Sequence, residues 1–400
     1  MSRKTIVTIS LLVLFIGFGF GQAAAEDPMK IAVVIEMTGP AASLGDYWTK
    51  GVALAVEEIN AKGGVLGRPI ETKIFDTQSK PPISVSAVKK ALAWKPVLIS
   101  GPIYSSSTLA NMFLGQEAEM PQFVGSENWR ITTKGSNYIW RTSTQQGFEI
   151  PKLLSWVMAE KKPKAIGMLH VNNDYGIGAM ETTKKVLKEK YNTDLALVMA
   201  TEQKQADYAA ELNQISRKKV DAVFCYMLEE ESAMFYRQVK KMGLDLLLFA
   251  PNSGISEDTL RLGKEAAAGV YGMSGFEYSA PEPNCQRVSK IYKDKYGSWP
   301  DNEFMKGYNS IYLAKIGYEM VGSFDTKKFS EKMRDVFITP DVEPNIVGGN
   351  LYYDKAGDLH SWDYLTTVVW NGEEAKPKIV GALPPLAGPD SSKPTKYFKD

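Results

Sequence analysis

Short apolar runs alternate with amphipathic stretches along most of this chain. The run from Met29 to Met37 is almost continuously apolar, which is typical of a parallel strand covered on both faces. It ends at Gly39-Pro40, and from Leu44 onward apolar residues recur at helical spacing until Gly63-Gly64 ends the pattern. This opening therefore predicts a strand followed by a long helix, one unit of a doubly wound α/β lobe.

The same alternation continues to about residue 275 with short connections. The predicted strands are Ile70–Asp76, Val97–Ser100, Gln122–Val124, Ala165–His170, Leu195–Ala200, Ala222–Tyr226, Leu246–Phe249 and Gly269–Gly275. The predicted helices between them are Ile83–Trp94, Ser106–Glu119, Phe148–Glu160, Ile177–Tyr191, Tyr208–Lys218 and Glu230–Met242. Later segments predict two or three helices, Cys285–Tyr296, Met305–Val321 and Lys327–Phe337, then strands Tyr364–Trp370 and Lys378–Val380. Alternation of this kind specifies parallel sheets with helices on both faces.

The opening motifs resemble those of a known family. MTGP, then LGDYWTKGVALAVEEINAKGGVLGRPIE, then FD are similar to the start of the periplasmic solute-binding proteins that serve branched-chain amino-acid ABC importers. The resemblance extends over almost the whole mature chain. It implies the type I periplasmic-binding fold, two doubly wound lobes with parallel sheets joined by a three-strand hinge that close on a small ligand. It also implies a membrane permease as the partner.

One sheet rarely takes so many strands, so the chain must divide. YIWRTSTQQG (Tyr138–Gly147) matches the family's first crossing between lobes, Phe276–Pro283 the second, and GNLYYDKAGD at 349–358 the last. We therefore expect an N-terminal lobe of residues 29–143 plus 278–350 and a C-terminal lobe of residues 146–276 plus 355–383. The polar, proline-rich residues 384–400 are expected to form a surface tail.

The N-terminal segment has the pattern of an export signal. Arg3 and Lys4 precede an apolar stretch, Ile6–Phe20, and Ala23-Ala24-Ala25 fits a small-residue cleavage site. A membrane anchor is the alternative, but the apolar stretch is short for a span. Residues 1–25 are thus predicted to be a signal peptide, and the mature protein is expected to begin near Glu26 in the periplasm.

Composition excludes several classes of function. The formal net charge is +1, and it becomes −1 once the two basic residues of the signal are removed, so nothing points to nucleic acid or an anionic membrane. Cys225 and Cys285 could pair, although Cys225 lies in an apolar strand pattern and could be a buried thiol. We expect a monomer.

One end of the expected ligand site lies at SGPIYSSSTLANM. A strand ends at Ser100, and the hydroxyl run beginning at Ser105 opens a helix whose first N–H groups make an anion site. Simple N-capping would explain the serine equally well. The resemblance implies that Ser105 and the backbone around Ile103 hold a ligand carboxylate. Tyr104 and Trp48 lie close to these motifs and could line an apolar or aromatic pocket.

Two further loops are implied by the same resemblance. Ser126, Glu127 and Asn128 follow a strand at the position from which the family supplies backbone groups and a hydroxyl to the ligand, although these residues also suit a turn. Tyr175, before a helix flanked by glycines, matches an aromatic that faces the cleft. Tyr226 lies one or two places early for a second family aromatic.

The chain departs from the family at the ammonium site. Amino-acid binders place a glutamate where FAPNSG has Asn252 and Ser253. A buried ammonium needs a charged partner, so a carboxylate or amide ligand without an α-amine, aromatic or not, is favoured over leucine-like ligands. Leucine, isoleucine and valine are expected to bind weakly. Glu127 is the one candidate that could serve as the charged partner of a ligand ammonium.

Signals of catalysis are absent from the sequence. There is no nucleophile elbow and no Walker loop, and His170 and His360 are far apart in sequence. No cysteine, histidine or carboxylate set has metal spacing, so neither a metal nor a cofactor is expected. Glu229-Glu230-Glu231 is most simply an acidic first turn of a helix. The rivals to an importer component are a ligand sensor that signals to a membrane receptor and, less favoured, a secreted hydrolase.

Overall fold

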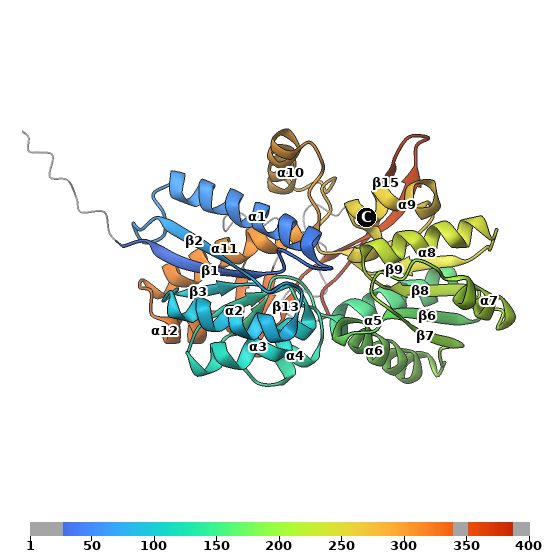
Figure 1. Ribbon diagram of the computed structural model, residues 1–400, viewed down its shortest axis with the longest axis horizontal. Helices are drawn as coiled ribbons and strands as arrows, with labels where there is room; N and C mark the ends of the chain where they lie inside the picture. Colours follow the sequence, from blue (N-terminus) through green and yellow to red (C-terminus); the bar gives the residue numbers. More distant parts are fainter. Residues whose placement is uncertain (1–26, 339–350, 387–400) are drawn as a thin grey trace, which may run out of the picture.

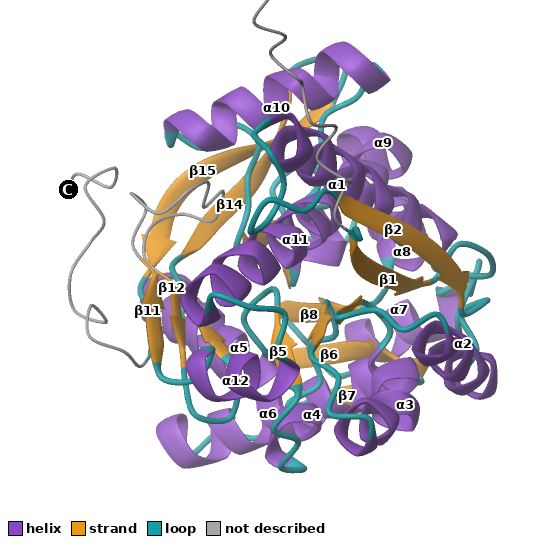
Figure 2. Ribbon diagram, turned by 90° about the vertical axis from the view of Figure 1, so that its left-hand side faces the viewer, coloured by secondary structure: helices purple, strands orange, loops and turns teal. Residues whose placement is uncertain are grey.

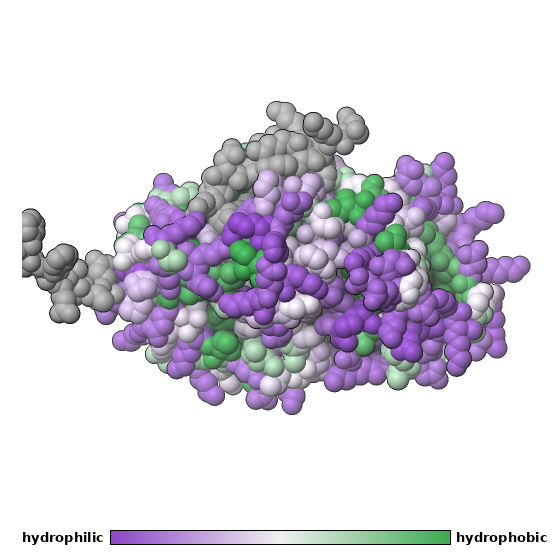
Figure 3. Space-filling view, turned by 90° about the horizontal axis from the view of Figure 1, so that it is seen from above, coloured by the Kyte–Doolittle hydropathy of each residue, from purple (hydrophilic) through white to green (hydrophobic). Residues whose placement is uncertain are grey.

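A computed structural model describes residues 27–338 and 351–386. The predicted signal peptide, the segment 339–350 and most of the predicted tail lie outside the described residues. Within residues 27–338 and 351–386, no helix combines the length and hydropathy that a membrane span requires. Figure 3 shows a mostly hydrophilic surface on the face that it presents.

The first lobe is built on a parallel sheet. Its strand order is β2-β1-β3-β4-β5. The strands are β1 (Met29–Ile35), β2 (Ile70–Asp76), β3 (Leu98–Ser100), β4 (Gln122–Val124) and β5 (Ile139–Arg141). The helices of this lobe are α1 (Ala42–Ala61), α2 (Pro81–Ala93), α3 (Ser105–Glu117), α4 (Arg130–Thr133), α10 (Pro283–Tyr296), α11 (Asn302–Val321) and α12 (Thr326–Lys332).

The second lobe is built on a mixed sheet with the order β15-β14-β10-β9-β8-β6-β7. Its parallel strands are β6 (Ile166–Val171), β7 (Leu197–Thr201), β8 (Ala222–Tyr226), β9 (Leu247–Ala250) and β10 (Tyr271–Ser274). β14 (Asp363–Trp370) and β15 (Ala375–Leu383) add to it antiparallel. The helices are α5 (Gln146–Trp156), α6 (Asp174–Tyr191), α7 (Ala209–Arg217), α8 (Glu229–Lys241) and α9 (Glu257–Gly263). Figure 1 shows the two lobes side by side, which confirms the predicted two-lobed α/β architecture.

Strand β1 shows why its sequence is almost continuously apolar. Ile31, Val33 and Ile35 belong to the core that contains α1 and α11, whereas Ala32 and Val34 pack with α2 on the opposite face. A strand covered on both sides buries every side chain, whichever way it points.

Helices α1 and α11 approach each other closely on one side of the first sheet, as Figure 2 shows. A Cβ added at Gly51 would lie 2.1 Å from the carbonyl oxygen of Phe304, and one added at Gly307 would lie 2.2 Å from that of Trp48. Only glycine permits this contact. It fixes the position of Lys306, which neighbours Gly307 in sequence and enters the site described below.

The chain passes between the two lobes in three places: after β5, after β10, and between β13 (Leu359–His360) and β14. The first and last passages are tied together. Arg141 Nε donates to Asp358 Oδ1 at 2.5 Å, and the hydroxyls of Thr144 and Ser361 lie 3.1 Å apart. These contacts join two of the three passages of the hinge.

The structure corrects the sequence analysis in several elements. The helix predicted over Lys327–Phe337 ends at Lys332, because Asp335 has a φ of +56° and the apolar residues after it form β11 (Val336–Ile338), which pairs with β12 (Leu351–Tyr353). The short helices α4 and α9 and the short strands β5, β12 and β13 were not predicted as elements. Cys225 and Cys285 are both free and buried, one in each lobe, so the buried-thiol alternative holds.

Candidate functional site

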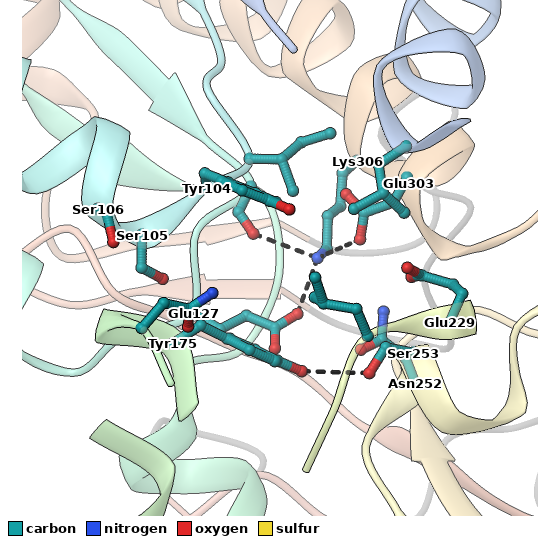
Figure 4. Close-up of a pocket in the computed structure, with 15 residues that line it drawn as sticks. Tyr104, Ser105, Ser106, Glu127, Tyr175, Glu229, Asn252, Ser253, Glu303 and Lys306 are labelled. Atoms are coloured by element: carbon teal, nitrogen blue, oxygen red, sulfur yellow. Dashed lines mark hydrogen bonds and ion pairs between the residues drawn. The ribbon is translucent and has the colours of Figure 1, made fainter. Parts of the chain in front are cut away.

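A cleft lies between the lobes, and its empty space, including the part open to solvent, is about 490 Å³. Figure 4 shows the side chains that surround it. Of the predicted site residues, those that line this cleft are Ile103, Tyr104, Ser105, Glu127, Tyr175, Asn252 and Ser253. The other lining residues are Leu44, Ser106, Gly125, Asn173, Leu228, Glu229, Glu303 and Lys306.

The start of α3 forms one wall of the cleft. The backbone N–H groups of Ile103 and Tyr104 already donate to the carboxylate of Glu36, at 3.0 and 3.4 Å. Glu36 is fully buried, and burial raises its pKa to about 7 despite these hydrogen bonds. The Ser105 hydroxyl accepts from the N–H of Asn128 at 3.2 Å, so its own hydrogen remains available to a ligand in the cleft.

A buried lysine lies at the centre of the cleft. Lys306 Nζ is 2.8 Å from Glu127 Oε1, 2.7 Å from Glu303 Oε1 and 3.2 Å from the carbonyl oxygen of Gly125. Burial alone would lower the pKa of Lys306, but the two carboxylates outweigh it and raise the pKa well above the usual value. Oε2 of Glu127 and Oε2 of Glu303 are buried and have no hydrogen-bond partner among the described residues.

The second lobe supplies the opposite wall. Tyr175, in the first turn of α6, lies with its hydroxyl 3.4 Å from that of Ser253, and its ring packs on Tyr226 with the centroids 4.6 Å apart. Asn252 and Ser253 belong to a 3-10 turn after β9. Glu229 begins α8, and Figure 4 shows its carboxylate facing the same space as Lys306. Carboxylates from both lobes therefore meet in one cleft.

Four predicted residues do not line the cleft. Trp48 is fully buried beneath Gly125, and its Nε1 donates to Ser100. The hydroxyl of Ser126 is 2.5 Å from that of Thr108, inside the first lobe. Tyr226 lies behind Tyr175. The fourth, Asn128, makes contacts outside the cleft that join the two lobes.

Two contacts connect the lobes beside the cleft. Asn128 Nδ2 donates to the carbonyl oxygen of Asp174 at 2.5 Å. Arg130 Nη2 lies 2.5 and 2.7 Å from the two carboxylate oxygens of Glu181 on α6. Because each pair takes one residue from each lobe, both contacts would break if the lobes moved apart. We take the structure to be a closed arrangement.

Neutralising the ion pair between lobes should weaken ligand binding only slightly. About a third of each side chain of Arg130 and Glu181 is exposed, so solvent screens the pair. Glu181→Gln is expected to cost the closed state about 0.5–1 kcal/mol, which corresponds to a two- to fivefold weaker affinity by calorimetry. The effect should vanish at high salt and in the Arg130→Gln background. An equal loss in that background would show that the pair does not hold the lobes together.

The sequence analysis missed Lys306, Glu303 and Glu229. The first two lie in a helix that reads as an ordinary core element, and Glu229 reads as one of three acidic residues in a first turn. One signal was available: Lys306 is the only charged residue within the stretch Phe304–Leu313. A buried lysine implies a carboxylate partner nearby.

Comparison with known proteins agrees with this architecture. A family model described as periplasmic binding protein matches residues 28–357. A leucine-, isoleucine-, valine-, threonine- and alanine-binding protein of Pseudomonas aeruginosa is 25% identical over 364 residues, covering 90% of this chain and 95% of its own. The Leu/Ile/Val-binding protein of Escherichia coli is 23% identical, covering 89% and 94%.

Solved structures match the fold closely. An ABC-transporter solute-binding protein from Rhodopseudomonas palustris, in complex with 3,4-dihydroxybenzoic acid, aligns with a TM-score of 0.81 at 21% identity, covering 91% of this chain and 99% of its own. A leucine-binding protein from Thermotoga maritima aligns with a TM-score of 0.76 at 22% identity, covering 89% and 98%. A structure that holds an aromatic acid and a structure named as a leucine-binding protein thus both share this fold.

Proposed function

The chain belongs to the periplasmic binding protein family, and we propose that it captures a small solute between its lobes and delivers it to the membrane permease of an ABC importer. The observation that carries the proposal is a single cleft lined from both sides, by Tyr104 and Ser105 of the first lobe and Tyr175 and Ser253 of the second. A ligand that contacts both walls favours the closed arrangement, because the open one offers it only half of these contacts.

The proposed role is binding without chemistry. The relatives are named as binding proteins. The proposed location is the periplasm. The N-terminal signal would direct export there and would be cleaved near Glu26.

We place a polar or anionic head of the ligand at the start of α3. Ser105 supplies a hydroxyl there, and the helix dipole favours negative charge. Since Glu36 occupies the N–H groups of Ile103 and Tyr104, the head would use Ser105 and Ser106 instead. This differs from the family pattern that the sequence suggested.

The body of the ligand would lie among apolar and aromatic side chains. Leu44, Tyr104, Tyr175 and Leu228 provide this surface. It suits the alkyl or ring portion of a carboxylate, an amide or an amino-acid-like solute, of which the sequence favoured a carboxylate or amide without an α-amine. Burial of that portion would supply most of the affinity.

The expectation of weak leucine binding loses its premise in the structure. It rested on the lack of a carboxylate near Asn252, yet Glu303 and Glu229 line the cleft together with Asn252. Glu127 was the candidate for pairing with a ligand ammonium, and one of its two carboxylate oxygens accepts from Lys306. A ligand with positively charged or N–H donor groups is therefore compatible with this cleft.

Ser105→Ala should lower the affinity for the ligand about tenfold, since it removes one hydrogen bond to a desolvated polar head. A thermal-shift panel of amino acids, aromatic acids, amides and urea would first identify a ligand, because binding stabilises the folded state. Calorimetry would then compare the variant with Ser86→Ala, an exposed serine on α2 that serves as a control. Equal affinity of Ser105→Ala and the unmodified protein would place the head group elsewhere.

A further inference from the structure

A second cavity adjoins the cleft, and its empty space, including the part open to solvent, is about 470 Å³. The two share Glu229, Asn252 and Glu303 as a common wall. The second cavity is lined in addition by Ile255, Ser256, Glu257, Leu260, Ser274, Phe276, Glu277, Tyr278, Pro300, Asp301, Asn302 and Pro377. A ligand that passes between Glu229 and Glu303 would leave the first cavity and enter the second.

The second cavity is strongly acidic. Its lining includes the carboxyl groups of Glu229, Glu257, Glu277, Asp301 and Glu303, and no lysine or arginine among the residues that line it. In the first cavity the one lysine, Lys306, is already shared between two carboxylates. Lys293 and Arg261 act on Glu257 from outside the lining. The acids that line this space therefore outnumber the cations that act on them.

The pKa values of these carboxyl groups agree with an excess of acidic groups in the second cavity. Burial raises the pKa of Glu229 well above its usual value, and the neighbouring Asp301 and Glu303 raise it further. Burial likewise raises the pKa of Glu277 to about 7. A positive charge placed among these groups would favour their ionised forms and would be bound in return.

Some of these acids have structural roles, so the cluster alone would not indicate a ligand. Asp301 caps α11 by accepting from the N–H groups of Glu303 and Phe304, and Glu277 accepts from the N–H of Ser279. Glu303 is different. Its side chain lies on the wall shared by both cavities, and the residue is only 4% exposed. Its Oε2 makes no hydrogen bond of standard geometry to a described residue, although the Asn252 side chain lies near enough to lower the pKa of Glu303. A buried carboxylate oxygen in that position lacks a donor that a ligand could supply.

We propose that the ligand of this protein carries, at the end opposite its head group, a positively charged amine or guanidine that passes between Glu229 and Glu303 into the second cavity. The solute class is thus a carboxylate, or a similar polar head, joined by a short chain to a distal cation. This inference rests on the proposed function, because it assumes a head group at Ser105.

Matched pairs of solutes isolate the distal charge. Lysine and norleucine share the α-amino acid head and nearly the same chain, and differ in the terminal ammonium. The pair 6-aminohexanoate and hexanoate makes the same comparison without an α-amine. Calorimetry with the full mature protein is expected to show at least tenfold tighter binding of the charged member in one of the two pairs.

Variants locate the effect. Glu229→Gln and Glu257→Gln should each reduce the preference for the charged member at least threefold. Glu189→Gln, an equal charge change on the exposed part of α6, should leave the preference unchanged. Circular dichroism would establish that each variant is folded.

The outcomes separate the two proposals. Equal or tighter binding of norleucine and hexanoate would overturn the distal cation while leaving the solute-binding role intact. A preference for the charged members that Glu229→Gln and Glu257→Gln do not alter would place the cation elsewhere and would also overturn this inference. If the unmodified protein bound none of the four solutes and nothing in the wider panel, the proposed function would fail together with it.

Discussion

Lys306→Met is expected to lower the free energy of unfolding by about 3–5 kcal/mol, because it leaves two buried carboxylates without their cation. The side chain of Lys306 is 1% exposed, and those of Glu127 and Glu303 are 4% and 6% exposed. Water can therefore hardly replace the lost interaction. Urea denaturation followed by circular dichroism measures the change, and the deficit should shrink as pH falls and the stranded carboxyl groups take up protons.

Two controls make that result specific. Lys315→Met removes a solvent-facing ion pair from the same helix and should cost less than 1 kcal/mol. Adding Glu127→Gln and Glu303→Gln to Lys306→Met should recover most of the loss, since neutral amides tolerate burial better than unpaired charges. A loss below 1 kcal/mol for Lys306→Met would mean that the three charges are not coupled as the distances indicate.

The fold was largely predictable because its signals are local. The apolar run at β1, the helical spacing of α1 and the glycines that end α1 all lie within about forty residues of sequence. The errors arose where pairing decides the structure. β11 forms because β12 lies beside it, and the sequence of Val336–Ile338 does not predict that partner.

The candidate site was predictable only in part, for a related reason. Sequence position identifies which loops reach the cleft, and seven predicted residues line it. It does not fix the direction of each side chain. Ser126 and Asn128 flank Glu127, yet both turn to partners outside the cleft, because neighbouring residues of an extended segment point in different directions.

The charged centre of the site could not be found by local reasoning. Lys306 and Glu127 are 179 residues apart, and they meet only because Gly51 and Gly307 let α11 lie close against α1. The departure at Asn252, which the sequence showed, suggested a ligand without an amine. Glu229 and Glu303 remove the premise of that expectation, since both carboxylates line the same cleft as Asn252, while the class of ligand stays a prediction.

Arg141→Met is expected to cost about 3–5 kcal/mol of stability and to weaken ligand binding as well. Arg141 is fully buried and donates to Asp358, to the carbonyl oxygens of Ser126 and Asn128, and to the Thr132 hydroxyl, at 2.5, 2.6, 2.9 and 3.0 Å respectively. Methionine fills a similar volume but donates to none of them, so the Asp358 carboxylate is left buried without its cation.

The loss of affinity follows from the position of those acceptors. The carbonyl oxygens of Ser126 and Asn128 bracket Glu127, so Arg141 holds in place the loop that carries a cleft carboxylate, while Asp358 belongs to the last passage between the lobes. Denaturation and calorimetry on the same variant should therefore both change, whereas Arg237→Met, at an exposed position of α8, should change neither. Reduced stability with unaltered affinity would contradict the link between the hinge and the cleft, because a loop released from Arg141 could not keep Glu127 in its position against Lys306.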